Sequence, residues 1–156
     1  MKFILVLLNF TILSAAINFD NPDKLNNNDY NLKKHNVILG AFDDRTGLSF
    51  LGYTYNVYQT EKDEFFIGGG TMIIGFTGTL GWKHYYRKSR FSISSAMTLQ
   101  RVYHLGFIGT MPTSSFTLEY QLLKRIKIKF GAYGAFLITD DWDFEPAIMP
   151  FLNLNF

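Results

Sequence analysis

Apolar and polar side chains alternate along most of the chain, from about residue 35 to the C-terminus. In Ser114–Leu122, for example, Phe116, Leu118 and Tyr120 share one face while Ser115 and Glu119 lie on the other. Alternate side chains point to opposite faces of a β-strand, so a period of two predicts strands. The same pattern covers three further segments, namely Arg90–Gln100, Arg125–Leu137 and Ile148–Phe156.

Four earlier segments are less regular but also predict strands. They are Asn36–Asp43, Gly47–Tyr58, Glu64–Ile74 and Phe76–Arg87. The glycine run at 68–70 predicts a bend or close packing, since glycine weakens an ordinary strand. After the first residues, no stretch is long and apolar enough for a membrane helix, which needs about 20 residues. The sequence therefore predicts an all-β, antiparallel up-and-down barrel of about eight strands.

The predicted connections alternate in length. Those at 60–63, 87–89 and 123–125 are short, whereas Arg101–Pro112 and the segment around Asp140–Asp143 are longer. Outer-membrane barrels have short periplasmic turns and longer outer loops. The longer connections fall on the outer side if the chain starts in the periplasm. We expect Arg101–Pro112 and Thr139–Phe144 to be surface loops.

The first 16 residues have the pattern of a secretory signal peptide. Lys2 precedes an apolar stretch, Phe3–Leu13, and Ser14 and Ala16 stand at the −3 and −1 positions of a cleavage site. Residues 17–34 are rich in Asn and Asp and predict a flexible lead-in. The predicted organisation is a cleaved signal peptide (1–16), a lead-in (17–34) and a β-barrel domain (35–156).

The composition of the polar faces indicates which side of the sheet is exposed to bulk water. They are mainly Ser, Thr, Gly, Asn and Gln with few charges, unlike the charge-rich surface of a soluble domain. Those few charges are Arg90, Glu119, Lys127, Lys129 and Lys83. We expect the first four to form an interior ion network. Aromatic residues also gather near the predicted strand ends, as in the girdles of membrane barrels. They are Tyr53, Tyr55, Tyr58, Trp82, Tyr85, Tyr86, Tyr103, Tyr120, Trp142 and Phe144. The alternative is that these rings fill a soluble core.

The last strand, Phe151-Leu152-Asn153-Leu154-Asn155-Phe156, ends on Phe with apolar residues two and four positions earlier. This end resembles the terminal assembly signal of bacterial outer-membrane barrels, which the barrel-insertion machinery reads. The chain is thus similar to the small eight-stranded outer-membrane proteins, which include adhesins, structural anchors and some lipid-modifying enzymes. The resemblance implies an outer-membrane location, with outer-membrane lipid and lipopolysaccharide as neighbours. It fixes no activity.

Composition excludes several classes of function. The chain has no cysteine, which excludes disulfides and thiolate sites, and its net charge of +2 is too balanced to favour nucleic acid. It is also 47% hydrophobic and 17% aromatic.

None of the candidate chemical sites in the sequence can be assigned a function. None of His35, His84 and His104 has a serine two positions later, as the outer-membrane lipid A deacylases would require. His84 shares a strand face with Trp82 and is interpreted as a boundary residue, and His104 as exposed in the long loop. Glycines 68–70 lack the Lys and Ser or Thr of a phosphate loop. Three acidic residues of one loop are interpreted as solvated, because they do not match a calcium-binding loop: Asp140, Asp141 and Asp143. We predict no catalytic residue, cofactor or metal.

The leading interpretation is an integral barrel with a structural or surface-interaction role. A general diffusion pore is not expected, because eight strands leave room only for side chains. Two alternatives stay open: an outer-membrane lipid-modifying enzyme (a lipid A acyl hydrolase or transferase), and a soluble periplasmic barrel that binds an apolar ligand.

Overall fold

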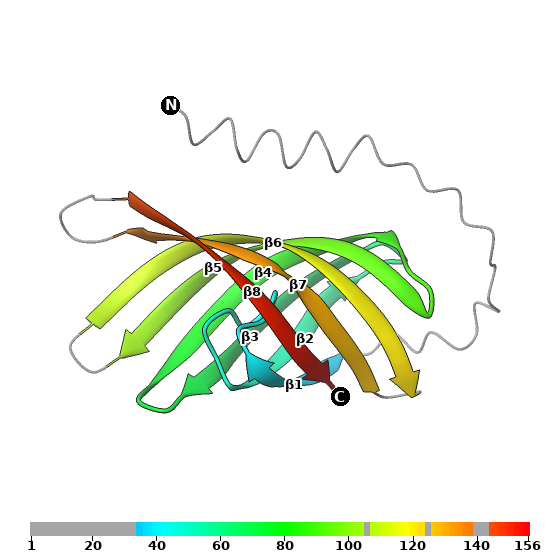
Figure 1. The fold of residues 1–156 in the computed structure, drawn as a ribbon, viewed down its shortest axis with the longest axis horizontal. Coiled ribbons are helices and arrows are strands. Elements are labelled where there is room, and N and C mark those ends of the chain that lie inside the picture. Colours follow the sequence, from blue (N-terminus) through cyan, green and yellow to red (C-terminus); the bar gives the residue numbers. More distant parts are fainter. Residues whose placement is uncertain (1–33, 105–106, 124–125, 139–143) are drawn as a thin grey trace.

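The chain forms a closed antiparallel barrel in which each strand pairs with the next and β1 pairs with β8 (Figure 1). The computed structural model describes residues 34–104, 107–123, 126–138 and 144–156. The predicted signal peptide and all but the last residue of the lead-in lie outside these ranges. The strands are β1 (His35–Ala41), β2 (Leu51–Gln59), β3 (Asp63–Met72), β4 (Gly75–Arg87), β5 (Phe91–His104), β6 (Phe107–Leu123), β7 (Ile126–Ile138) and β8 (Phe144–Asn155). Within these ranges, no helix is long and apolar enough to cross a membrane.

The alternation of the sequence becomes the two faces of the barrel wall. In β6, for example, Ser115, Thr117 and Glu119 are buried inside, whereas Tyr120 and Leu122 are exposed outside. The predicted all-β, eight-stranded antiparallel barrel is confirmed, as are the apolar and polar faces of this strand.

The connection between β1 and β2 differs from the prediction. The expected strands Asn36–Asp43 and Gly47–Tyr58 were too long, because β1 ends at Ala41 and β2 begins at Leu51. Phe42 and Gly47 both have φ of 63°, a left-handed conformation that interrupts an extended chain. Residues 42–50, which we call the inner loop, therefore turn back into the barrel, as the cyan trace in Figure 1 shows.

The predicted long loop Arg101–Pro112 is also wrong. β5 and β6 stay paired as far as His104 and Phe107, so most of this segment is strand. Proline lacks the N–H that a ladder requires, yet Pro112 lies within β6. The backbone N–H of Gln121 donates to the carbonyl of Arg90, next to the start of β5. Odd-numbered residues of β6 therefore direct their backbone groups to β5, and even-numbered residues direct theirs to β7. The β6–β7 register has no pair at Pro112, and the strand tolerates proline there.

The glycine run in β3 lies in a continuous ladder with both neighbouring strands, so the predicted bend is absent. The predicted close packing is present. A Cβ atom on Gly70 would overlap the side chain of Ser49 in the inner loop, and one on Gly52 would lie 2.7 Å from Thr46. Inward-facing glycines thus leave the space that the inner loop occupies.

The interior combines an apolar cluster with charged residues. Val102, Met111, Tyr133, Ala135 and Phe151 form the buried cluster. Phe42, Leu48, Met72 and Met149 pack against it. Tyr85, which we expected in an outer aromatic girdle, instead points inward and is buried. Its odd position in β4 places it on the same face as Lys83.

Candidate functional site

The inner loop carries three charged residues into the barrel on a tight turn. The backbone N–H of Asp43 donates to the carbonyl of Gly47 at 2.9 Å, and that of Gly47 donates to Asp43 at 2.8 Å. The Asp43 carboxylate also accepts the backbone N–H of Arg45 at 2.8 Å. Aspartate favours turns because its side chain can bond the backbone two residues ahead. The turn leaves Asp43, Asp44 and Arg45 fully or almost fully buried.

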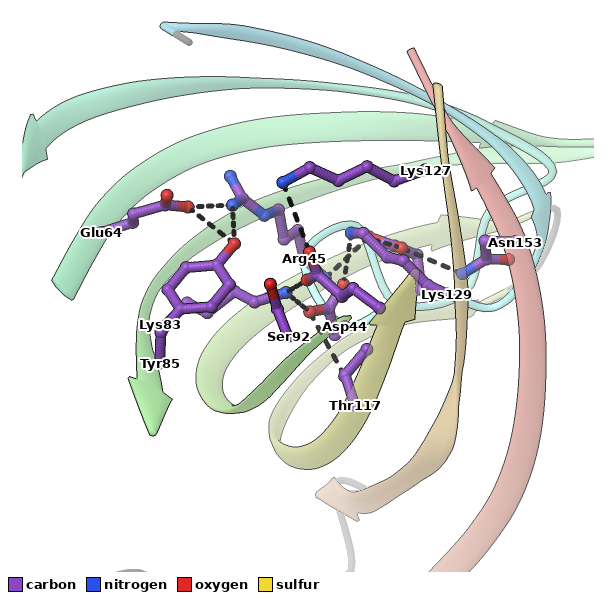
Figure 2. Close-up of polar contacts among 12 residues, drawn as sticks. Asp44, Arg45, Glu64, Lys83, Tyr85, Ser92, Thr117, Lys127, Lys129 and Asn153 are labelled. Atoms are coloured by element: carbon purple, nitrogen blue, oxygen red, sulfur yellow. Dashed lines mark hydrogen bonds and ion pairs between the residues drawn. The ribbon is translucent and has the colours of Figure 1, made fainter. Parts of the chain in front are cut away.

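Asp44 lies between two lysines of the barrel wall (Figure 2). Its carboxylate forms an ion pair with Lys83 of β4 and accepts from Lys129 of β7 at 2.8 Å. Lys83 also pairs with Glu119 of β6, and Lys129 lies 3.2 Å from Asp43. The inner loop is thus tied by charge to strands on different sides of the barrel.

Arg45 extends this network towards β3. Its guanidinium pairs with Glu64 and donates to Asn56 Oδ1 at 2.8 Å. Glu64 also accepts from Lys88 at 3.0 Å, and Lys127 lies 3.5 Å from Glu119. Figure 2 shows Arg45 between Glu64 and the hydroxyl of Tyr85.

The charges of this network, which we call the interior network, nearly balance. Among the described residues it holds four carboxylates and five cations: Asp43, Asp44, Glu64 and Glu119 with Arg45, Lys83, Lys88, Lys127 and Lys129. Removing a charge from water is costly unless a partner of opposite sign is close. The paired arrangement therefore fixes the position of the inner loop, and loss of one partner would leave a buried charge uncompensated.

The predicted network is confirmed in part. Glu119, Lys127 and Lys129 belong to it, together with Lys83, which the predicted network did not include. Arg90 does not, because its guanidinium is exposed, donates to the carbonyl of Gln121 and stacks over the ring of Tyr120.

The prediction missed the residues of the inner loop, together with Glu64 and Lys88. The run Asp43-Asp44-Arg45-Thr46-Gly47 between two apolar segments is a turn signal, and could have identified the loop. Nothing in a turn signal tells whether the turn points into the barrel or away from it.

Of the two predicted histidine environments, that of His84 agrees with the structure and that of His104 does so only in part. His84 faces outward beside Trp82, as expected, and its Nδ1 lies 2.8 Å from Asp63 Oδ1. His104 is exposed but ends β5, so its predicted position in a long loop is wrong. His35 Nδ1 lies 2.6 Å from the hydroxyl of Tyr53.

The acidic residues Asp140, Asp141 and Asp143, with Trp142, lie outside the described residues. In the part of the chain that the structure describes, no group of three His, Cys, Asp or Glu residues is arranged to hold a metal ion.

The outer surface of the barrel is apolar. One row across β3, β4 and β5 contains Ile67, Leu80 and Leu99, whose exposed fractions are 52%, 56% and 45%. On β7 and β8, Phe130 and Leu152 are 56% and 66% exposed. Charged residues are buried inside beside the apolar cluster, while large apolar side chains cover the outside, which reverses the arrangement of a water-soluble domain.

Comparison with known proteins gives no relative. No protein-family model matches the chain, and neither the curated proteins nor the solved structures contain a significant match.

Proposed function

We propose that the protein is an integral barrel of the bacterial outer membrane with a structural or surface-interaction role. The observation that carries this proposal is the reversed polarity of the wall. Lys83 and Glu119 are buried inside, whereas Leu80 on the strand of Lys83 and Tyr120 next to Glu119 are exposed on the outside. A membrane barrel needs such an outward apolar band, whereas in water this surface would favour aggregation.

The aromatic residues support the same proposal. Phe65, Trp82 and Tyr86 lie outside near the barrel end that holds the β2–β3 turn, and His35 packs against Tyr53 near the same end. Near the opposite end, Phe76 and Tyr103 stack with ring centroids 4.7 Å apart. Amphipathic rings favour both boundaries of a membrane.

The pairing of the final strand supports our proposal that the barrel-insertion machinery assembles the protein. Phe156 exchanges backbone hydrogen bonds with Val37 at 2.8 and 3.1 Å, so the terminal residue helps to close the barrel. In this proposal, outer-membrane lipid and lipopolysaccharide surround the wall.

The filled interior favours a structural role over transport. Tyr85, Tyr133 and Lys129 are buried inside together with the inner loop. The same interior disfavours a soluble carrier of an apolar ligand, since its centre holds paired charges.

Fractionation of cells that express the full chain tests this proposal. We expect the protein in the outer membrane after an alkaline wash, with gel mobility that changes on heating. Leu80→Arg should destabilise the barrel in lipid by about 2–4 kcal/mol, because the charge enters the apolar band. Glu61→Arg, at an exposed turn residue, is the matched control. Release of the wild-type protein into the soluble fraction without detergent would contradict the proposal.

A further inference from the structure

Three polar residues form a row across the outer faces of β3, β4 and β5. Asp63 of β3 pairs directly with His84 of β4, and His84 pairs directly with Ser95 of β5. Their sequence neighbours Glu64, Lys83 and Ser94 are buried inside, so alternation directs the three side chains outward. Direct cross-strand neighbours have Cβ atoms about 4.5–5.5 Å apart. The row therefore places an imidazole between an acid on one adjacent strand and a hydroxyl on the other.

The imidazole is held in one orientation. His84 Nδ1 lies 2.8 Å from Asp63 Oδ1, and Trp82 Nε1 donates to the same oxygen at 2.9 Å. A carboxylate only accepts, so the proton of the neutral imidazole lies on Nδ1 and Nε2 keeps its lone pair. A histidine fixed in this way by an acid is suited to act as a general base.

The hydroxyl of Ser95 has a second polar neighbour. Tyr86 Oη lies 2.7 Å from Ser95 Oγ, and the Tyr86 ring meets the His84 ring edge-on with centroids 5.1 Å apart. Tyrosine hydroxyls can stabilise the oxyanion formed when a hydroxyl attacks an ester. Tyr86 is placed for this role once Ser95 turns towards His84.

We propose that Asp63, His84, Ser95 and Tyr86 form a site that hydrolyses carboxylic esters of membrane glycerophospholipids. The inference rests on the proposed function, in which this face contacts lipid. Trp82 and Tyr86 belong to the aromatic belt, which marks the boundary between headgroups and acyl chains. The ester of a glycerophospholipid joins its acyl chain to the headgroup region, so it lies at the same depth.

The reaction follows from these positions. Ser95 Oγ attacks the ester carbonyl carbon while its proton passes to His84 Nε2, and Tyr86 donates a hydrogen bond to the oxyanion. The carbon–oxygen bond to the glycerol then breaks, and His84 returns the proton to the leaving alkoxide. Water attacks the acyl-Ser95 ester with His84 again as base, which releases a fatty acid and restores the serine. Asp63 is a positioning residue, because it acts through His84.

The test uses the purified full-length barrel in detergent micelles containing a dioleoyl glycerophospholipid. We expect release of lysophospholipid and fatty acid, and labelling of Ser95 by a fluorophosphonate, located by mass spectrometry. Ser95→Ala should abolish both, and His84→Asn should lower kcat by about 10³-fold or more. Asp63→Asn should lower kcat at constant KM, with partial rescue by Asp63→Glu.

Two matched variants serve as controls. Ser114→Ala changes another outward serine, and His35→Asn changes a histidine that pairs with a tyrosine rather than an acid. Both should leave the rate unchanged, and heat-modifiable mobility should confirm that each variant folds. Full activity of folded Ser95→Ala, or a membrane-resident wild type with no labelling and no lipid cleavage, would overturn this inference alone. A wild type found in the soluble fraction would overturn the proposed function itself.

Discussion

Lys83 illustrates how single residues hold the interior together. Its ammonium group is buried and pairs with Asp44 of the inner loop and Glu119 of the wall. Neither carboxylate has access to water, so each depends on cations for compensation. Lys129 supplies a second cation to Asp44, and Lys127 lies near Glu119.

Replacement of Lys83 by methionine should be strongly destabilising. The substitution keeps a side chain of similar length but leaves two buried carboxylates with less compensation, which costs about 3–5 kcal/mol. Urea unfolding of the barrel in lipid vesicles would measure the change in free energy. Lys62→Met, at an exposed turn position, should have a negligible effect. Equal stabilities of the two variants would show that the interior network contributes little.

At the scale of elements, the two edges of β8 differ. One edge pairs with β7 over the whole strand, but β1 pairs only with Leu152–Asn155. The backbone N–H and C=O of Phe156 both bond to Val37 of β1. The even-numbered residues of β8 therefore also direct their backbone groups to the β1 side. Pro146 and Pro150 are two of these residues and lack an N–H. An open edge with few donors is poorly suited to pairing with another chain.

Pro150→Val should promote association between copies of the protein. The change restores a backbone N–H at the open edge and adds a β-branched side chain there. Pro112→Val is the matched control, because its restored N–H would face β7 within the barrel. Analytical ultracentrifugation in detergent should detect oligomers of the first variant only. A monomeric Pro150→Val would show that other features protect this edge.

At the scale of the whole molecule, the wall is apolar outside and the interior is filled. The inner loop, the interior network and the buried aromatic residues Phe66, Tyr85 and Tyr133 together occupy the interior. An eight-stranded barrel has an interior only wide enough for side chains. The architecture thus favours a closed barrel.

Liposomes that contain the wild-type protein should therefore show no swelling in small sugars and no steady ion conductance. Replacement of residues 43–49 by a Gly-Ser segment should increase conductance, because it removes the inner loop from the interior. Planar-bilayer recordings of both proteins provide the measurement. Steady conductance of the wild-type barrel would contradict a closed interior.

The sequence determined the strands and the faces of most of them. Phe116, Leu118 and Tyr120 alternate with Thr117 and Glu119, and the barrel keeps this division. Alternation is a local property of an extended chain, so it can be recognised without knowledge of the fold. The polar composition of one face also predicted that Glu119 and Lys129 lie in a shared interior.

Only the tertiary structure decided where the inner loop lies and which charges pair. Asp44 and Lys129 are 85 positions apart, and they meet because the barrel closes around the loop. The row of Asp63, His84 and Ser95 likewise depends on the register of three strands. A register shift of one residue reverses the face of every side chain in a strand, and register follows from the closure of the whole barrel. Contacts of this kind cannot be derived from residue types and local spacing alone.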